Sequence, residues 1–403
     1  MKAIEEKADY VSGFVLALFF ALPVLRVTAG IGAVAYFVLT GFLLGIIAFQ
    51  GAMGWTRRLR SYELWAVGAL FLLLGWLLIT ALWTVSNNQY VDDSILITGL
   101  LVLTASVPFI AKEKARAATL WTLCSIGVAT GAYVLYGYTA VDSLRGYEVL
   151  FRDFYLNVSQ SIGAAAVGLT VYTLFARERR WWQVAVIPLL FIALALSLAR
   201  GALLFGLLVS VVAMFYALYR MSIDRSSVGK YLGSVLKKAS GFGAIVGGGI
   251  MVITVALAVE RTARRLERLI SGEGASSVEE RLSLWRTSWE SIQDAPILGH
   301  GLGSNGVMTG ATETFYPHNF FLQVWLDGGI VAALLTAFVV GLPIIMFFTR
   351  GDKVDSVGLS FLAIYIFMLL EYSKSYNFYT ARILFISYVI AICSLSKTRS
   401  KSE

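Results

Sequence analysis

The strongest constraint on the fold is a series of long apolar segments that recurs along the whole chain. A helix needs about 20 mostly apolar residues to cross a bilayer, and the sequence contains about twelve such segments. Their approximate centres are residues 18, 40, 73, 102, 129, 167, 190, 210, 250, 334, 363 and 386. We therefore expect an all-α fold, in which residues 1–403 form a single polytopic membrane domain with about twelve transmembrane helices.

The composition agrees with a membrane protein. Apolar residues make up 58% of the chain and charged residues only 14%, whereas soluble proteins carry about 25% charged residues. The net charge of +8 would suggest a nucleic acid partner in a soluble protein. In a membrane protein it is explained by basic loops beside an anionic lipid surface, so we expect membrane lipids and no nucleic acid as partners.

Basic residues are distributed unevenly over the loops. The loops after the second, fourth and sixth segments contain TRRLR, KEKAR and RERR. The positive-inside rule then places both termini in the cytoplasm. The loops after odd-numbered segments lie on the opposite, outer face, where Asp92 and Asp93 are expected in a short loop that caps the fourth helix. One outer loop is long, and residues 261–317 form an insertion between the ninth and tenth segments.

The insertion contains a predicted amphipathic helix with the sequence SSVEERLSLWRTSWESIQDAP. Ser277 is the expected N-cap, because a glutamate follows three residues later. Leu282, Trp285 and Trp289 recur at helical spacing, and Pro296 ends the helix. We therefore expect a large helical loop on the outer face.

Four arginines open the insertion at i, i+3, i+4, i+7 spacing, which places them on one face of a helix. They are Arg261, Arg264, Arg265 and Arg268. Guanidinium groups suit bidentate binding of phosphate or pyrophosphate. The alternative is that these side chains only anchor the helix at the membrane edge. Arg281, further along the insertion, belongs to the same set of candidate substrate-binding residues.

Other charged residues lie near the outer ends of apolar segments. Arg200 interrupts an apolar run and indicates a tight turn between the seventh and eighth segments. A charge so close to the membrane is costly, which makes Arg200 a functional candidate; the alternative is an interfacial anchor. Glu371 and Lys374 fall at the outer end of the eleventh segment, where either residue could pair with an outer arginine or line a site.

His318 is one of only two histidines in the chain. It lies between Pro317 and Asn319, at the end of the arginine-rich insertion and at the start of the tenth segment. A neutral imidazole there could take a proton from an attacking hydroxyl. The alternative is a polar residue that serves only the helix start.

The second histidine, His300, belongs to the stretch ILGHGLGSNG. Its glycines match G-x-G-x-x-G, but no strand precedes them, so we interpret the match as chance and the stretch as a flexible turn. The two cysteines lie far apart within apolar runs, and no D-x-D pair occurs. Too few ligands are present for zinc, and we expect metal-independent chemistry without a cofactor.

Four stretches resemble the bacterial O-antigen ligase and polymerase family of multispanning membrane proteins. SLARG at 197–201 is similar to the S-x-S-R-G turn of that family, with Ala199 in place of the second serine. RLSLWRTSW at 281–289 and PILGHGLG at 296–303 resemble the helix and the glycine turn of the outer loop. PHNFFLQVWLDGGIVA at 317–332 resembles the H-N-x-x-L stretch and the helix that follows it.

The resemblance implies a glycosyltransferase of the bacterial inner membrane with a periplasmic active site. The donor would be a glycan on undecaprenyl pyrophosphate, and the acceptor of a ligase would be lipid A carrying its core oligosaccharide. By motif, the essential histidine and arginine of the family correspond to His318 and Arg200. Arg265, or its neighbour Arg268, corresponds to a loop arginine, and Asn319 completes the H-N motif.

Three other functions remain open. An O-antigen polymerase would use another lipid-linked glycan as acceptor, and a protein O-oligosaccharyltransferase of the same family would use a protein. A lipid-glycan flippase or solute transporter would also have about twelve spans, but transporters place charges near the bilayer midplane. In this chain most segments have apolar middles, and the charges gather at the outer ends, which favours an enzyme.

Overall fold

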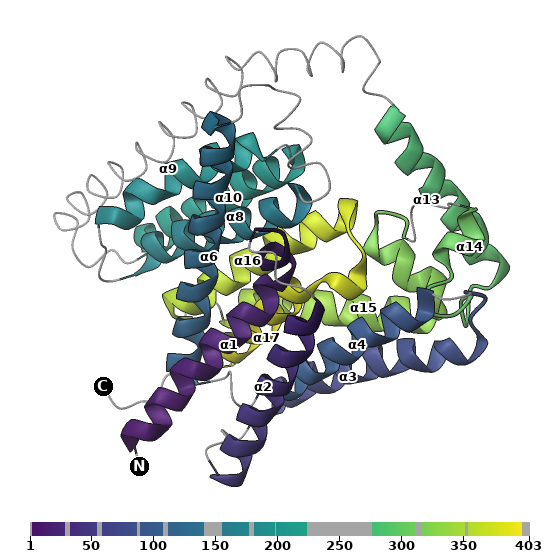
Figure 1. Cartoon of the computed structure of the whole chain (residues 1–403), viewed down its shortest axis with the longest axis horizontal. Helices are drawn as coiled ribbons and strands as arrows, with labels where there is room; N and C mark the ends of the chain where they lie inside the picture. The colour runs from purple at the N-terminus through teal and green to yellow at the C-terminus, as the bar shows by residue number, and fades with distance from the viewer. Residues whose placement is uncertain are drawn as a thin grey trace. The chain divides into compact units, whose positions relative to one another are not determined.

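The protein is described from a computed structural model of the whole chain (Figure 1). No strand occurs among the described residues, so the prediction of an all-α fold is confirmed for them. The structure describes residues 2–28, 33–54, 59–86, 89–107, 112–140, 155–176, 181–197, 199–223, 276–310, 316–350 and 354–396.

Every predicted segment centre within these ranges lies in a helix; the centre at residue 250 lies outside the described residues. The helices before the insertion are α1 (Lys2–Thr28), α2 (Ala33–Ala52), α3 (Ser61–Ile79), α4 (Gln89–Ala105), α6 (Glu113–Ala140), α8 (Tyr155–Phe175), α9 (Trp181–Leu196) and α10 (Arg200–Ile223). The later ones are α13 (Ser276–Asp294), α14 (Asn305–Thr309), α15 (Phe320–Arg350), α16 (Ser356–Ser375) and α17 (Arg382–Leu395). Two short 3₁₀ helices, η1 (Thr80–Trp83) and η3 (Phe378–Thr380), complete the described elements.

Six helical segments among the described residues are long and apolar enough to cross a membrane. They are Ser61–Trp83, Glu113–Ala140, Tyr155–Phe175, Arg200–Arg220, Phe320–Arg350 and Ser356–Ser375. Two shorter apolar helices are α9 and α17. The total of about twelve spans and the outer-face position of the insertion stay predictions. The amphipathic helix is confirmed as α13, although it begins at Ser276 and so already includes the expected cap, Ser277.

The chain divides into two compact units. Unit 1 comprises residues 1–43, 113–264 and 355–368, and unit 2 comprises 44–112, 265–354 and 369–403. In unit 1, α6 packs against α1, α8 and α9, and α8 also packs against α10. In unit 2, α15 packs against α3, α13 and α17, and α3 lies beside α4 (Figure 1).

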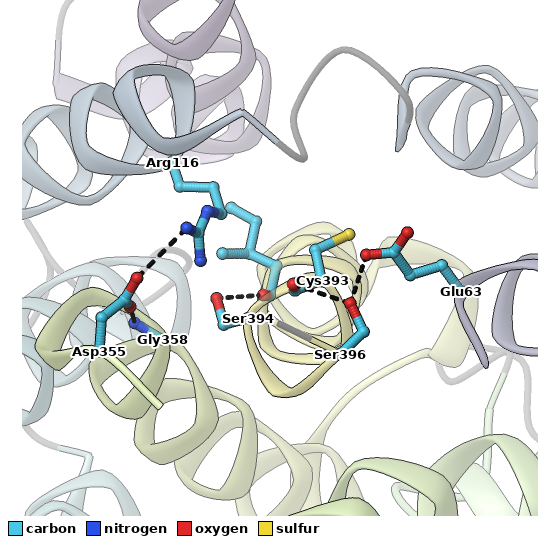
Figure 2. Close-up of polar contacts among 8 residues, drawn as sticks. Glu63, Arg116, Asp355, Gly358, Cys393, Ser394 and Ser396 are labelled. Carbon is cyan, nitrogen blue, oxygen red and sulfur yellow. Dashed lines mark hydrogen bonds and ion pairs between the residues drawn. The ribbon is translucent and has the colours of Figure 1, made fainter. Parts of the chain in front are cut away.

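A partly buried charge pair joins two helix starts in unit 1. The Arg116 side chain is only 1% exposed, and its Nη2 lies 3.2 Å from Oδ2 of Asp355 (Figure 2). The other oxygen of Asp355 accepts a hydrogen bond from the Gly358 amide at 2.7 Å. Asp355 therefore both caps the start of α16 and neutralises a charge in α6.

A second buried carboxylate joins α3 to the end of α17 in unit 2. Glu63 is fully buried and accepts hydrogen bonds from the Arg60 amide, at 2.8 Å, and from the Ser396 hydroxyl (Figure 2). The Arg60 guanidinium donates to the Ser396 carbonyl. These bonds supply partners for backbone groups that the two helix ends would otherwise leave unpaired.

Candidate functional site

The site in unit 2 is organised by a break in α15. Gly329 has φ 66° and ψ −166° and divides the helix into two helical segments. Near this break, the carbonyls of Leu326 and Asp327 accept hydrogen bonds from the amides of His300, at 2.8 Å, and Gly301, at 3.0 Å. The Ile330 amide, beyond the break, donates to the Pro296 carbonyl at 2.9 Å. The glycine turn at 296–303 is therefore fastened to α15 on both sides of the break.

The glycine turn is closely packed, and the prediction of a flexible turn is wrong. Gly301 has φ 89°, and a Cβ added there would lie 2.3 Å from Cα of Thr84. The Thr84 hydroxyl donates to the Leu302 carbonyl at 2.7 Å. The His300 Nε2 lies 2.7 Å from the Ser291 carbonyl of α13. His300 therefore contributes to holding α13 against the turn.

His318 immediately precedes the start of α15 and has an unusual backbone conformation. It is the one non-glycine residue with positive φ, at 54°, in the part of the chain that the structure describes. Such conformations cost free energy and concentrate at functional sites. Its neighbours fix this geometry, because the Pro317 carbonyl accepts from Nε1 of Trp285 at 2.8 Å, and the Tyr316 ring lies 4.7 Å from the imidazole, edge to face.

Asn319 caps α15. Its Oδ1 accepts hydrogen bonds from the amides of Phe321, at 3.0 Å, and Leu322, at 3.3 Å. Asparagine is a common N-cap residue, because its side-chain oxygen can accept hydrogen bonds from the backbone amides of the first helical turn. The structure thus gives Asn319 a local role, and its predicted role in substrate binding stays a prediction.

The surroundings of His318 favour the neutral imidazole. Burial lowers its pKa most, and the charge of Arg281 lowers it further; the Ser375 backbone and Glu280 raise the pKa, and Lys374 has the smallest effect, which lowers it. The buried Nδ1 has no hydrogen-bond partner among the described residues. In the neutral tautomer that carries its proton on Nε2, this bare nitrogen is able to accept a proton.

Charged residues from two helices surround this histidine. Glu371 of α16 is fully buried, and its Oε1 lies 3.2 Å from Nζ of Lys374. Arg281 of α13 interacts electrostatically with His318, Glu371 and Lys374. The structure thus brings together His318, Arg281 and Glu371, which the sequence nominated separately, and two positive charges lie near the imidazole.

The other predicted residues are not among those that the structure describes around His318 in unit 2. Arg200 is the first residue of α10 in unit 1, and its side chain is exposed. Since α9 ends at Leu196, the predicted tight turn is confirmed. The predicted arginine stripe, Arg261, Arg264, Arg265 and Arg268, lies outside the described residues.

Two polar residues that sequence reasoning missed join α15 to the segment after α16. Gln323 is 1% exposed; its Nε2 donates to Oδ1 of Asn377 at 2.9 Å, and its Oε1 accepts from the Phe378 amide at 2.8 Å. The same Asn377 oxygen accepts from the Tyr379 amide at 2.8 Å. The sequence did contain a signal for Gln323: it is an amide side chain within an apolar run, and a buried amide requires hydrogen-bond partners.

A buried carboxylate cluster lies next to these amides. Asp327 accepts from the Tyr379 hydroxyl at 2.5 Å and from the Ser304 amide and hydroxyl at 3.2 and 3.0 Å. Asp93 is fully buried within α4, where Gln89 donates to it at 3.2 Å. Its predicted place in a loop is therefore wrong. No group of three or more His, Cys, Asp or Glu side chains suited to a metal ion occurs among the described residues.

Comparison with known proteins gives one match. Residues 153–337 match the family model described as O-antigen ligase. The matched range includes Arg200, α13, the glycine turn and His318, whereas Glu371 and Lys374 lie beyond it. No curated protein matches the chain. The apolar helices indicate a multi-pass membrane protein. Residues 153–337 therefore resemble the O-antigen ligase family, which supports an activity of the O-antigen ligase and polymerase type.

Proposed function

We propose that the protein is an O-antigen ligase of the bacterial inner membrane, with both termini in the cytoplasm and the site around His318 facing the periplasm. It transfers a glycan from undecaprenyl pyrophosphate to lipid A–core oligosaccharide. The observation that carries this proposal is a neutral imidazole with a bare Nδ1 beside two cationic side chains. A group-transfer enzyme with an anionic leaving group needs both features.

The reaction balances without a metal ion or a nucleotide. A hydroxyl oxygen of the acceptor attacks the anomeric carbon of the donor sugar, and the bond from that carbon to the phosphate oxygen breaks. The bonding electrons leave with undecaprenyl pyrophosphate, and the hydroxyl proton passes to Nδ1 of His318. Because the hydroxyl displaces the leaving group directly, the anomeric configuration inverts.

The cationic residues have separate roles in this proposal. Arg200 and Arg265 stabilise the charge that develops on the pyrophosphate, since fixed guanidinium groups act most strongly where charge appears in the transition state. Arg281, with Arg261, Arg264 and Arg268, binds the donor phosphates before reaction. Glu371 balances the neighbouring lysine, and the amide nitrogen of Asn319 contacts the glycan.

The test is reconstitution of the purified protein with both lipid substrates in the presence of EDTA, with products separated on a gel. His318→Gln is expected to lower transfer by about 100- to 10,000-fold, the usual contribution of a general base. His300→Gln is the matched control: it changes the other histidine, and its amide can still donate to the Ser291 carbonyl. That variant is expected to retain transfer.

The products distinguish the alternatives. Glycan on lipid A–core, made by the wild type and by His300→Gln but not by His318→Gln, supports the ligase. Longer glycan that remains on undecaprenyl pyrophosphate would identify a polymerase, and glycan on an added protein acceptor would identify a protein O-oligosaccharyltransferase. A folded wild type that transfers to none of these acceptors would exclude the proposal and favour a transporter.

A further inference from the structure

We propose that a patch of four apolar side chains beside the break in α15 lies in the membrane–water interface and contacts the lipid bilayer. The patch consists of Trp289 of α13, Ile297 and Leu298 of the glycine turn, and Trp325 of α15. Its contact with lipid holds the insertion at a fixed depth on the bilayer surface. The inference concerns where these side chains lie, and it does not depend on the reaction proposed above.

The length of α15 indicates which part of it crosses the membrane. Its 31 residues are about 46 Å long, whereas the hydrocarbon core of a bilayer is about 30 Å thick. A straight helix of this length would need a tilt of about 50°, beyond the usual limit of about 40°. The segment after the break, residues 330–350, is about 32 Å long and fits without this tilt. Gly329 therefore marks the edge of the hydrocarbon core, and Asp327, a residue type that is costly within the core, lies outside it.

The second part of α15 exposes one apolar face along its length. Four exposed apolar side chains recur at i, i+4, i+11 and i+14, which places them on one side of the helix. They are Leu334, Phe338, Ile345 and Phe348. Ile330 lies on the same side, one turn before Leu334. In a membrane this side contacts lipid, so the lipid-facing surface of α15 extends up to the break.

The patch adjoins the point where this lipid-facing surface ends. The Ile330 amide donates to the Pro296 carbonyl at 2.9 Å, and the next two residues, Ile297 and Leu298, are 64% and 52% exposed. A Cβ added at Gly329 would meet backbone atoms of both residues. Ile297 and Leu298 are therefore at the level where α15 leaves the hydrocarbon core, and their exposed side chains continue its lipid-facing surface.

Two tryptophans complete the patch. Nε1 of Trp325 donates to the Pro296 carbonyl at 3.4 Å, and its ring lies 5.5 Å from the ring of Trp289, edge to face. The Trp289 side chain is exposed. Tryptophan is enriched at membrane–water interfaces, because its ring is apolar and its N–H remains polar. The composition of the patch thus fits the boundary between head groups and acyl chains.

The charges of α13 lie away from the patch. Its exposed charged residues fall within about 120° of the helix circumference. They are Glu279, Glu280, Arg286, Glu290 and Asp294. Ser283 is also exposed and lies at the middle of this charged face, about 120° around the helix from Trp289. A helix with a charged face and an apolar edge is typical of one that lies on a bilayer surface.

The consequence for the site rests on the proposed function. The first part of α15, residues 320–328, is about 14 Å long, so His318, which precedes it, lies within roughly 20 Å of the hydrocarbon edge. The head-group layer occupies about 5–8 Å of that distance. By fixing the depth of the insertion, the patch keeps the proposed base close to the layer in which a lipid-borne pyrophosphate lies.

Fluorescence quenching in vesicles measures the depth of the patch. Leu298→Cys is labelled with a polarity-sensitive fluorophore, on a background in which the two buried cysteines, Cys124 and Cys393, are changed to alanine. The protein is reconstituted in vesicles of phosphatidylethanolamine and phosphatidylglycerol that carry a nitroxide either near the head group or deep in the acyl chain. Interfacial segments bury their apolar side only about 5–10 Å. The emission is therefore expected to shift to the blue and to be quenched mainly by the shallow nitroxide.

Ser283→Cys is the matched control, because it labels the same insertion on the charged face of α13 and hardly changes the side-chain volume. Its label is expected to emit as in water and to lose little emission to either nitroxide. Ile297→Cys is a second test variant in case Leu298→Cys does not fold, and it should behave like Leu298→Cys.

The outcomes separate the patch from other arrangements. Quenching of the patch label by the shallow nitroxide, with little quenching at residue 283, supports the inference. A patch label that no nitroxide quenches would overturn it: water-like emission would mean solvent, and blue emission would mean cover by protein, such as a second copy of the chain. Stronger quenching by the deep nitroxide, or equal quenching at residue 283, would also overturn it. None of these measurements needs glycan transfer, so a quenched patch in a protein that transfers no glycan would refute the proposed function alone.

Discussion

Gly329→Ala is a substitution for which the structure predicts a large loss of stability. The φ of 66° and ψ of −166° at this residue fall in a region that is essentially restricted to glycine,. A Cβ added there would lie 2.0 Å from the Ile297 carbonyl oxygen and 2.3 Å from its carbon. These are backbone atoms of the glycine turn, so the contact cannot be relieved by rotating a side chain.

The magnitude follows from two contributions. The backbone conformation alone costs an alanine about 1–3 kcal/mol. Moving the turn away weakens the hydrogen bonds from His300, Gly301 and Ile330, each of which contributes about 0.5–1.5 kcal/mol. A loss of at least about 3 kcal/mol is therefore expected, which corresponds to about 6–12 °C in Tm for a cooperative unit of about 150–250 residues.

The assay is thermal unfolding in detergent, measured as the fraction of monodisperse protein that survives heating. Gly68→Ala is the control, because Gly68 lies within α3 in the same unit and has no heavy atom near its Cβ position. That change is expected to have no destabilising effect. If Gly329→Ala and Gly68→Ala have melting temperatures within 2 °C of each other (a difference of under about 1 kcal/mol), the account of the break in α15 is wrong.

Two further predictions concern pH and the buried charge pair. Because the pKa of His318 is lowered, the imidazole stays neutral below the ordinary histidine pKa of about 6.5, and kcat should fall only at lower pH. Arg281→Met removes a nearby positive charge and should move that fall to higher pH. A fall in kcat centred above pH 6.5 in the wild type would contradict the role of His318 as the base. Asp355→Asn keeps the cap on α16 but removes the charge facing Arg116. We expect a loss of about 1–3 kcal/mol in thermal unfolding, less than for a fully buried pair because Asp355 is 37% exposed,; an unchanged Tm would show that the pair contributes nothing.

Local patterns in the sequence predicted the elements well. Apolar length gave the helices, spacing gave α13, and the interruption around Arg200 gave the turn between α9 and α10. Each of these features depends on residues within a few turns of one another, which periodicity can detect. The approximate grouping of His318 with Glu371 could also be inferred from the sequence, because both residues fall at the predicted outer ends of apolar segments.

Contacts between distant segments could not be predicted in this way. The bond between Gln323 and Asn377 joins residues 54 positions apart, and neither residue belongs to a recognisable motif. The glycine turn was misread because its tight packing depends on Thr84 and on the break in α15. A string of glycines indicates backbone freedom, but only the tertiary contacts show whether that freedom is used for motion or for close approach.

The bond between Gln323 and Asn377 also has a consequence for biosynthesis. The ribosome completes Asn377 54 residues after Gln323, which at about 5–20 residues per second is a delay of roughly 3–11 s. During that interval the Gln323 amide has been made but has neither of its partners, Asn377 and Phe378. The nascent chain therefore inserts the start of α15 with a buried-type amide still unpaired, and the polar contacts of this helix are complete only after α16 and η3 have been synthesised.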